Sequence, residues 1–192
     1  MIAELHTTTQ LTTAEQLLFD LVNIPSPSHE EHKAVAHLVR WMHVNGYDNA
    51  FIDEAGNAVG IIGQGEREIV LLGHIDTFGG TLSVYVDDDV LYGRGSVDAK
   101  GALCTFTVAA AQAELADDVR LIVIGALEEE ASTSKGARYA STQSRPEMCI
   151  IGEPSQWDRI TLGYKGRLIL EWRWKGALAH SASATISPAE HA

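Results

Sequence analysis

Acidic and histidine residues follow several short apolar runs of this 192-residue sequence. His74 and Asp76 follow IVLLG, three glutamates at 128–130 follow LIVIGAL, and Glu153 follows CIIG. Apolar runs of this length are typical of buried strands in a parallel sheet, and such sheets place ligand sites just beyond the carboxyl ends of their strands. We therefore expect these side chains to converge at one edge of a sheet. One imidazole and several carboxylates in one place predict a divalent-metal site, with zinc as the first candidate.

Asp98 belongs to a different pattern, the glycine-rich segment GRGSVDAKG, at the start of an expected helix. Because glycine-rich segments before helices also bind phosphate, a nucleotide-binding module is an alternative interpretation. A dinucleotide fingerprint, however, requires glycine where Asp98 stands, and a P-loop requires Gly-Lys followed by Ser or Thr. A further carboxylate in an acidic site increases mutual repulsion, which cations between the groups relieve. Asp98 therefore favours the metal site over the nucleotide site.

Each of these motifs is weak by itself. A His-x-Asp pair is common, consecutive glutamates usually belong to a solvated surface, and Gly-Glu-Pro is often only a turn. Their combination is stronger, because separate apolar runs each end at a candidate ligand while the opposite ends of the runs carry no such set. A noncatalytic metal-binding fragment is a separate hypothesis, which metal stoichiometry and turnover measured on one sample distinguish from an enzyme.

Helices and strands are expected to alternate along the chain, which is typical of an α/β fold. Residues 1–161 are predicted to form a mostly parallel sheet flanked by helices. Apolar spacing, caps and breakers place helices at 12–22, 28–45, 98–115 and 134–143, strands at 50–53, 58–63, 69–73, 120–127 and 148–152, and a β-hairpin around the acidic turn 87–89.

The sequence pattern changes after Trp157. Apolar and polar residues alternate through ITLGYKGRLILEWRWKG, which predicts a half-buried antiparallel strand with one solvated face. A second module is therefore expected over residues 162–192. This module is expected to be cut off, because SPAEHA has the features of a helix start with almost no helix after it.

Composition argues against several classes of partner. The formal net charge of −12 disfavours nucleic acid, because phosphate binding requires clustered Lys and Arg. No segment approaches the roughly 18 apolar residues of a membrane span, and the N-terminal residues lack a basic region followed by an apolar stretch. We therefore expect a cytoplasmic protein that binds neither nucleic acid nor membrane.

Taken together, GHIDT, GRGSVDAKG, the EEE run before GAR, IGEPS and KGALAH resemble the two-zinc aminoacylase and carboxypeptidase family. This family includes acetylornithine deacetylase, succinyl-diaminopimelate desuccinylase and carboxypeptidase G, and the resemblance extends from NIPSPS to KGALAH. It implies an incomplete zinc-peptidase-like catalytic domain over 1–161. It also implies the start of an α+β lid and dimerisation domain over 162–192, through which the full-length protein would form a homodimer.

The resemblance implies a set of metal ligands. His74 and Glu153 would bind one zinc ion, Asp98 would bridge two zinc ions, and Glu130 would bind the second, with cobalt as a possible substitute. Asp76 would hydrogen-bond His74 and fix its orientation. Family members also have a cis peptide after the bridging aspartate, here between Asp98 and Ala99, and a final histidine ligand from a segment beyond the 192 residues. We therefore expect the second metal to lack one protein ligand.

The resemblance implies two further catalytic residues. A glutamate of the EEE run would act as the general base, taking a proton from water and giving it to the leaving amine. If the glycine of the family pattern corresponds to Gly136, the base is Glu129 and the metal ligand is Glu130. The alternative assigns Glu128 and Glu129 to these roles. His180 in KGALAH would reach across the dimer to stabilise the tetrahedral oxyanion.

The resemblance also implies a substrate class. EEEASTSKGAR and ITLGYKGRL are most similar to those family members that release lysine or ornithine from an amino-group carrier protein in lysine and arginine biosynthesis. The expected reaction is therefore hydrolysis of an amide bond, with the carrier protein as partner. Deacylation of a small N-acyl amino acid such as N-acetylornithine is the alternative.

Overall fold

The computed structural model describes residues 11–156, 158–163, 166, 168, 170–173 and 175. Contacts within the chain divide it into two units, Met1–Trp157 and Asp158–Ala192. All helices and strands of the described residues lie in the first unit. The domain boundary expected at residue 162 stays a prediction.

Four helices lie among the described residues of the first unit, each close to its predicted position. Helix α1 begins with a capping box, in which Thr12 Oγ1 accepts a hydrogen bond from the Glu15 backbone N–H at 3.3 Å and the Glu15 carboxylate accepts one from the Thr12 backbone N–H at 2.7 Å. The helices are α1 (Thr13–Asn23), α2 (His32–Val44), α3 (Lys100–Ala111) and α4 (Lys135–Gln143).

Helix α2 begins four residues later than the sequence predicts. Its expected apolar face is buried, with Leu38 and Met42 completely inaccessible to solvent. Ser28 does not start the helix, because its hydroxyl donates a hydrogen bond to Asp76 Oδ2 at 2.7 Å. A serine expected to act as a helix cap thus contacts the segment that follows the third strand.

Five strands form one sheet in the order β1-β2-β6-β3-β7. The sheet is mixed rather than mostly parallel, because β6 and β7 pair parallel with β3 whereas β1 and β2 form antiparallel pairs with β2 and β6 respectively. Only the three strands that carry the candidate residues are parallel to one another. The strands are β1 (Asn49–Ile52), β2 (Ala58–Ile62), β3 (Arg67–His74), β6 (Val119–Ala126) and β7 (Met148–Ile151).

Strand β7 is exposed, although its apolar sequence predicts a buried strand. Met148, Ile150 and Ile151 are 43–57% exposed. Within the described residues, β7 is an edge strand that pairs only with β3, so one of its sides has no neighbour. An apolar run therefore indicates a strand here, but it does not indicate the position of that strand in the sheet.

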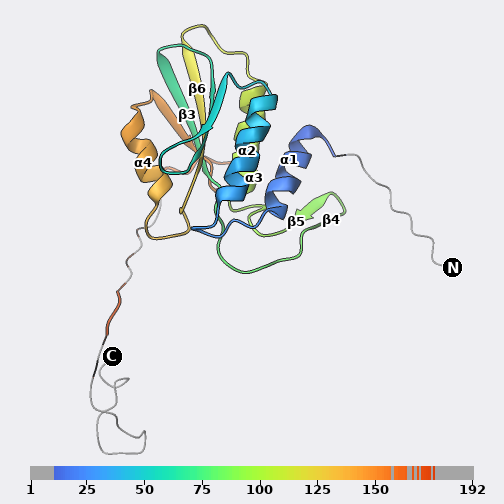
Figure 1. The fold of residues 1–192 in the computed structure, drawn as a ribbon, viewed down its shortest axis with the longest axis vertical. Coiled ribbons are helices and arrows are strands. Elements are labelled where there is room, and N and C mark those ends of the chain that lie inside the picture. The colour runs from blue at the N-terminus through green and yellow to red at the C-terminus, as the bar shows by residue number, and fades with distance from the viewer. Residues whose placement is uncertain are drawn as a thin grey trace, which may run out of the picture. The chain divides into compact units, whose positions relative to one another are not determined.

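The sheet carries helices on both sides. In Figure 1, α2 and α3 lie on one side of the sheet and α4 lies on the other. The core joins α1, α2 and α3 to the sheet, and the close approach of α3 depends on Gly73 in β3, where an added Cβ would lie 3.2 Å from Leu103 Cβ. The predicted hairpin is present as β4 (Tyr85–Asp87) and β5 (Val90–Tyr92).

The strand predicted after residue 162 is absent among the described residues of the second unit. Leu168 and Leu170 are 81% and 83% exposed, whereas a half-buried strand would cover one of its faces. An alternating pattern becomes a strand only when other strands or helices cover its apolar face, and the described residues of this unit supply none. No helix of the described residues is both long and apolar enough to cross a membrane.

Candidate metal centre

The carboxyl ends of three parallel strands bring the candidate residues together. His74 is the last residue of β3 and pairs in register with Ala126, the last residue of β6. The glutamates 128–130 follow β6 after one residue, Leu127. Strand β7 runs parallel on the other side of β3 and leads through Gly152 to Glu153. The candidate residues therefore converge at one edge of the sheet, as the apolar runs predict.

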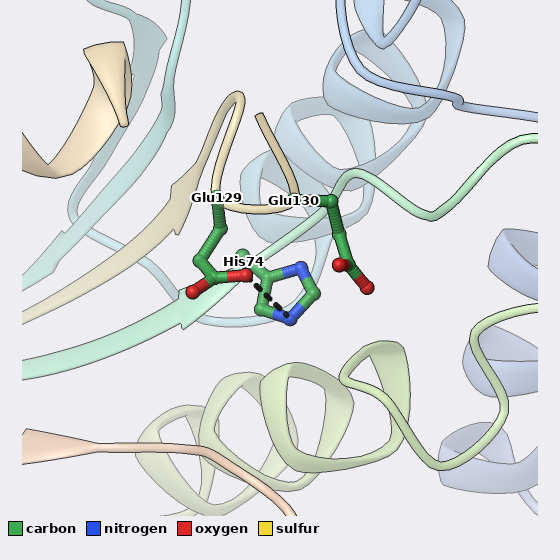
Figure 2. Close-up of side chains that lie close together, drawn as sticks. All are labelled: His74, Glu129 and Glu130. Atoms are coloured by element: carbon green, nitrogen blue, oxygen red, sulfur yellow. Dashed lines mark ion pairs between the residues drawn. The ribbon is translucent and has the colours of Figure 1, made fainter. Parts of the chain in front are cut away.

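Two groups of three possible ligands form around the imidazole of His74. The first group is His74, Asp98 and Glu153, and the second is His74, Glu129 and Glu130; in each group the ligand atoms lie within 4.8 Å of one another. His74 Nε2 lies 3.1 Å from Asp98 Oδ1 and 3.9 Å from both Glu129 Oε2 and Glu153 Oε2. Figure 2 shows Glu129 and Glu130 on either side of the ring.

The backbone after β3 determines which nitrogen of His74 is free. Its Nδ1 lies 2.9 Å from the main-chain carbonyl oxygen of Asp76 and 3.4 Å from the Asp76 carboxylate. Since a carbonyl oxygen only accepts, Nδ1 carries the proton and donates it. Nε2 faces the surrounding carboxylates and is therefore the nitrogen left to bind a metal. The expected contact between Asp76 and His74 is present, but its shortest hydrogen bond uses the main chain of Asp76.

The Asp76 carboxylate fixes the position of the glutamate loop. Its two oxygens accept hydrogen bonds from the backbone N–H groups of Glu129 and Glu130, both at 3.0 Å, and from the Ser28 hydroxyl. Burial acts to raise the pKa of Asp76, but the donors around it outweigh burial and hold this pKa below its ordinary value. One fully buried carboxylate therefore connects the end of β3, the loop after β6 and the segment before α2.

Glu128 is directed away from the His74 cluster. Its carboxylate accepts a hydrogen bond from the Thr133 hydroxyl and lies 3.3 Å from His29 Nδ1. The backbone N–H of Glu128 donates to the buried Glu31 carboxylate at 3.2 Å. Neither group of possible ligands includes Glu128. This geometry favours the pair Glu129 and Glu130 over the alternative pair.

The electrostatics of the cluster suit a cation. Burial, together with the neighbouring carboxylates, raises the pKa of both Glu130 and Glu153. Burial alone would lower the pKa of His74, but its contact with Asp76 and the charges of Glu153 and Glu129 raise it to about 9. Among the described residues, no Lys or Arg is ion-paired with Asp98, Glu129, Glu130 or Glu153. Carboxylates and one imidazole without a basic partner are the donor set of a divalent-metal site, so the residues fit such an ion.

The outcome for the other expectations is mixed. The peptide bond between Asp98 and Ala99 is cis, as the family resemblance implies. His180 lies outside the described residues.

The motifs did not predict the contributions of Ser28 and Glu31, which lie in the segment between α1 and α2 and contact the site from there. The only sequence signal for this segment is the breaker-rich NIPSPS.

The family profile described as peptidase family M20/M25/M40 matches residues 70–191, which is more than half of the chain. The chain belongs to peptidase family M20/M25/M40. The match includes all the candidate ligands as well as Asp76 and Glu129. Membership of the M20 family thus agrees with a cluster of possible metal ligands at the ends of parallel strands.

Curated relatives of this M20 chain share one described activity. The LysW-lysine hydrolase of Deinococcus radiodurans is 51% identical over 180 residues, which are 92% of this chain and 49% of the relative. A putative LysW-lysine/LysW-ornithine hydrolase of Thermococcus kodakarensis is 46% identical over 154 residues, which are 80% of this chain and 42% of that protein. The chain therefore spans about half the length of the curated relatives that it matches.

Solved structures share the fold of the chain. An M20 family metallo-carboxypeptidase from Sulfolobus solfataricus superposes with a TM-score of 0.60 at 16% identity, covering 74% of this chain and 37% of that chain. A tripeptidase from Staphylococcus aureus gives a TM-score of 0.60 at 18% identity, covering 74% of this chain and 43% of that chain. At these identities the likeness concerns the fold alone.

Proposed function

We propose that this protein is a zinc-dependent amide hydrolase that releases lysine or ornithine from the carrier LysW. The observation that carries the substrate class is the 51% identity to a LysW-lysine hydrolase over 92% of this chain. The observation that carries the reaction class is the convergence of His74 with four carboxylates at the ends of β3, β6 and β7. LysW is accordingly the proposed macromolecular partner.

In this proposal, His74, Asp98 and Glu153 hold one zinc ion, and Asp98 and Glu130 hold the second. Zinc at these positions supplies Lewis acidity, which polarises an amide carbonyl and acidifies water. Support for the first set comes from its geometry, because all three ligand atoms lie within 4.8 Å of one another. Support for Glu130 comes from its backbone, which Asp76 holds beside His74.

Glu129 is the proposed general base. Its carboxylate takes a proton from the attacking water and later delivers that proton to the leaving amine nitrogen. Two features support this role: the side chain is 47% exposed, so water reaches it, and Oε2 lies 3.9 Å from His74 Nε2. By the family resemblance, His180 stabilises the oxyanion across a homodimer in the full-length protein.

The test is turnover of LysW-lysine, LysW-ornithine and N-acetylornithine by the zinc-loaded full-length protein. We expect release of lysine or ornithine from LysW to be faster than deacetylation. Glu129→Gln keeps the shape of the side chain but cannot accept the proton, so we expect its kcat to fall by about 100-fold or more.

Glu128→Gln is the matched control, because it makes the same chemical change one residue earlier and we expect it to retain turnover. If Glu128→Gln lost turnover and Glu129→Gln retained it, the result would support Glu128 as the base and Glu129 as the metal ligand. Bound zinc without turnover of any of the three substrates would favour a noncatalytic metal-binding protein.

A further inference from the structure

A cavity of about 350 Å³ lies at the carboxyl end of α1 and is lined in part by the segment that follows this helix. Its wall includes Arg94, Lys100 and Thr77 but no acidic residue. Thr77 follows Asp76 directly and Lys100 lies two residues after Asp98, so the cavity and the metal centre share the same two backbone segments. A cavity with two basic side chains and no carboxylate is unexpected in a chain with a net charge of −12.

Arg94 has no partner for its charge among residues 11–156. Its Nε is buried without a hydrogen-bond acceptor, and its guanidinium makes no ion pair there. Arg67 and Arg120 of the same unit do make ion pairs, with Glu147 and Glu68 respectively, although Arg120 Nε is likewise buried without an acceptor. Withdrawing a charged donor from water without an acceptor costs free energy, so the surroundings of Arg94 favour an acceptor supplied from outside the described residues.

Lys100 adds a second positive charge to the same cavity. It is 1% exposed, and its Nζ donates hydrogen bonds to the carbonyl oxygens of Leu21 at 2.7 Å and Ile24 at 2.9 Å. An ammonium group has three protons, so one donor remains after these two bonds. The carbonyl oxygens fix Lys100 in place but do not neutralise it, and no carboxylate is paired with it among the described residues. The cavity wall therefore holds two basic side chains that form no ion pair among the described residues.

We propose that this cavity is an anion subsite that binds a carboxylate group through Arg94, with Lys100 supplying a second positive charge. The planar guanidinium offers two parallel donors to a carboxylate, which is the geometry of a bidentate pair. The choice of a carboxylate rests on the proposed function, because amino acids released from amides carry this group. An anion held here would lie beside the metal centre, where it would help to orient a substrate.

The experiment follows the Arg94 side chain directly. Zinc-loaded protein labelled with ¹⁵N-arginine is titrated with succinate, and the Nε–H signal lost in Arg94→Gln identifies Arg94. We expect this signal to move and saturate with succinate and to stay unchanged with succinamide, which has a similar shape but no charge. By calorimetry, we expect the Kd of succinate to rise by about tenfold or more in Arg94→Gln, since a hydrogen bond to a charged group contributes at least that factor.

Arg145→Gln is the matched control, because it removes the same charge from an exposed position and we expect it to bind succinate as the wild type does. Arg94→Lys keeps the charge but loses the bidentate fork, so its Kd should lie between those of the wild type and Arg94→Gln. An unmoved Arg94 signal, or an equal response to succinamide, would overturn the proposal.

Two further outcomes count against the carboxylate subsite. Succinate that binds zinc alone would bind Arg94→Gln as tightly as the wild type. Inorganic phosphate that moves the Arg94 signal when succinate does not would exclude a carboxylate as the ligand. No turnover is measured, so failure of the hydrolase assay and failure of this binding experiment are separate results.

Discussion

At the scale of single residues, Asp76 is the side chain on which the geometry of the metal centre depends most. Its main-chain carbonyl fixes the tautomer of His74, and its carboxylate holds the backbone of Glu129 and Glu130. The proposed general base and a proposed ligand are thus positioned by the residue that orients the histidine. The structure shows this second function of Asp76, which the His-x-Asp motif does not predict.

Replacing Asp76 with asparagine should disturb the glutamate loop. Asparagine has the same shape but only one accepting oxygen, and its NH₂ group would face a backbone N–H. We expect Asp76→Asn to lower the free energy of unfolding by about 2 to 3 kcal/mol. We also expect the backbone amides of Glu129 and Glu130 to exchange faster with solvent, which hydrogen-exchange NMR measures.

Ser28→Ala is the control for this prediction. It removes one donor to Asp76 but leaves both loop hydrogen bonds intact. We expect a loss of about 1 kcal/mol in stability and unchanged exchange at Glu129 and Glu130. Equal exchange rates in the two variants would show that the carboxylate does not hold the loop.

At the scale of elements, buried polar contacts join segments that are distant in the sequence. Lys100 at the start of α3 binds the carbonyl oxygens at the end of α1. Tyr47, between α2 and β1, is 8% exposed and donates a hydrogen bond from its hydroxyl to the Thr107 carbonyl of α3 at 2.9 Å. The Lys100 contact positions the start of α3, two residues after Asp98, and the Tyr47 contact holds the same helix further along.

The Tyr47 contact makes stability depend on pH. Burial raises the pKa of Tyr47 well above its ordinary value, and the hydrogen bond to Thr107 offsets only part of this shift. The unfolded chain releases the tyrosine proton near pH 10 while the folded chain retains it. The contribution of Tyr47 is therefore fully present below about pH 10 and is lost as the pH rises further.

We expect the free energy of unfolding of the wild type to fall more steeply above about pH 10 than that of Tyr47→Phe, by up to about 1.4 kcal/mol per pH unit. Denaturant titrations at several pH values measure this difference. Tyr85→Phe, the same change at a residue that is 50% exposed, should leave the slope of the wild type unchanged. Parallel curves for wild type and Tyr47→Phe would contradict the prediction.

At the scale of the whole molecule, the two groups of possible ligands compete for one atom. Both include His74, whose Nδ1 is used by the Asp76 carbonyl, so only Nε2 remains. Zinc sites normally have three or four protein ligands, with water completing a catalytic site. Only one of the two groups can therefore be complete at a time within this chain.

Since the proposed second site has only Asp98 and Glu130 as protein ligands, we expect the 192-residue chain to retain at most one zinc ion firmly after dialysis and to hydrolyse N-acetylornithine very slowly. Mass spectrometry of bound metal, made alongside the turnover assay, measures both. His74→Ala should lose the retained ion, and Glu128→Gln should keep it. Two retained zinc ions with rapid turnover would show that other residues complete the second site.

The sequence by itself determined the elements and the residue types of the site. Helices and strands follow from the local spacing of apolar residues, so ten of the predicted segments correspond to observed elements, with boundaries that differ by a few residues. The sequence also placed His74, Asp98 and Glu153 at the ends of elements that meet. These results depend on local periodicity and on the rule that parallel strands share one carboxyl edge.

Only the tertiary structure decided which neighbours these residues have. The mixed sheet, the exposed β7, the contacts that direct Glu128 away from His74, and the contact of Ser28 with Asp76 all depend on the tertiary structure. The Ser28 contact with Asp76, for example, spans 48 residues. Periodicity describes which face of an element is apolar but not which element covers it, so the sequence predicted the members of the site and the fold determined their arrangement.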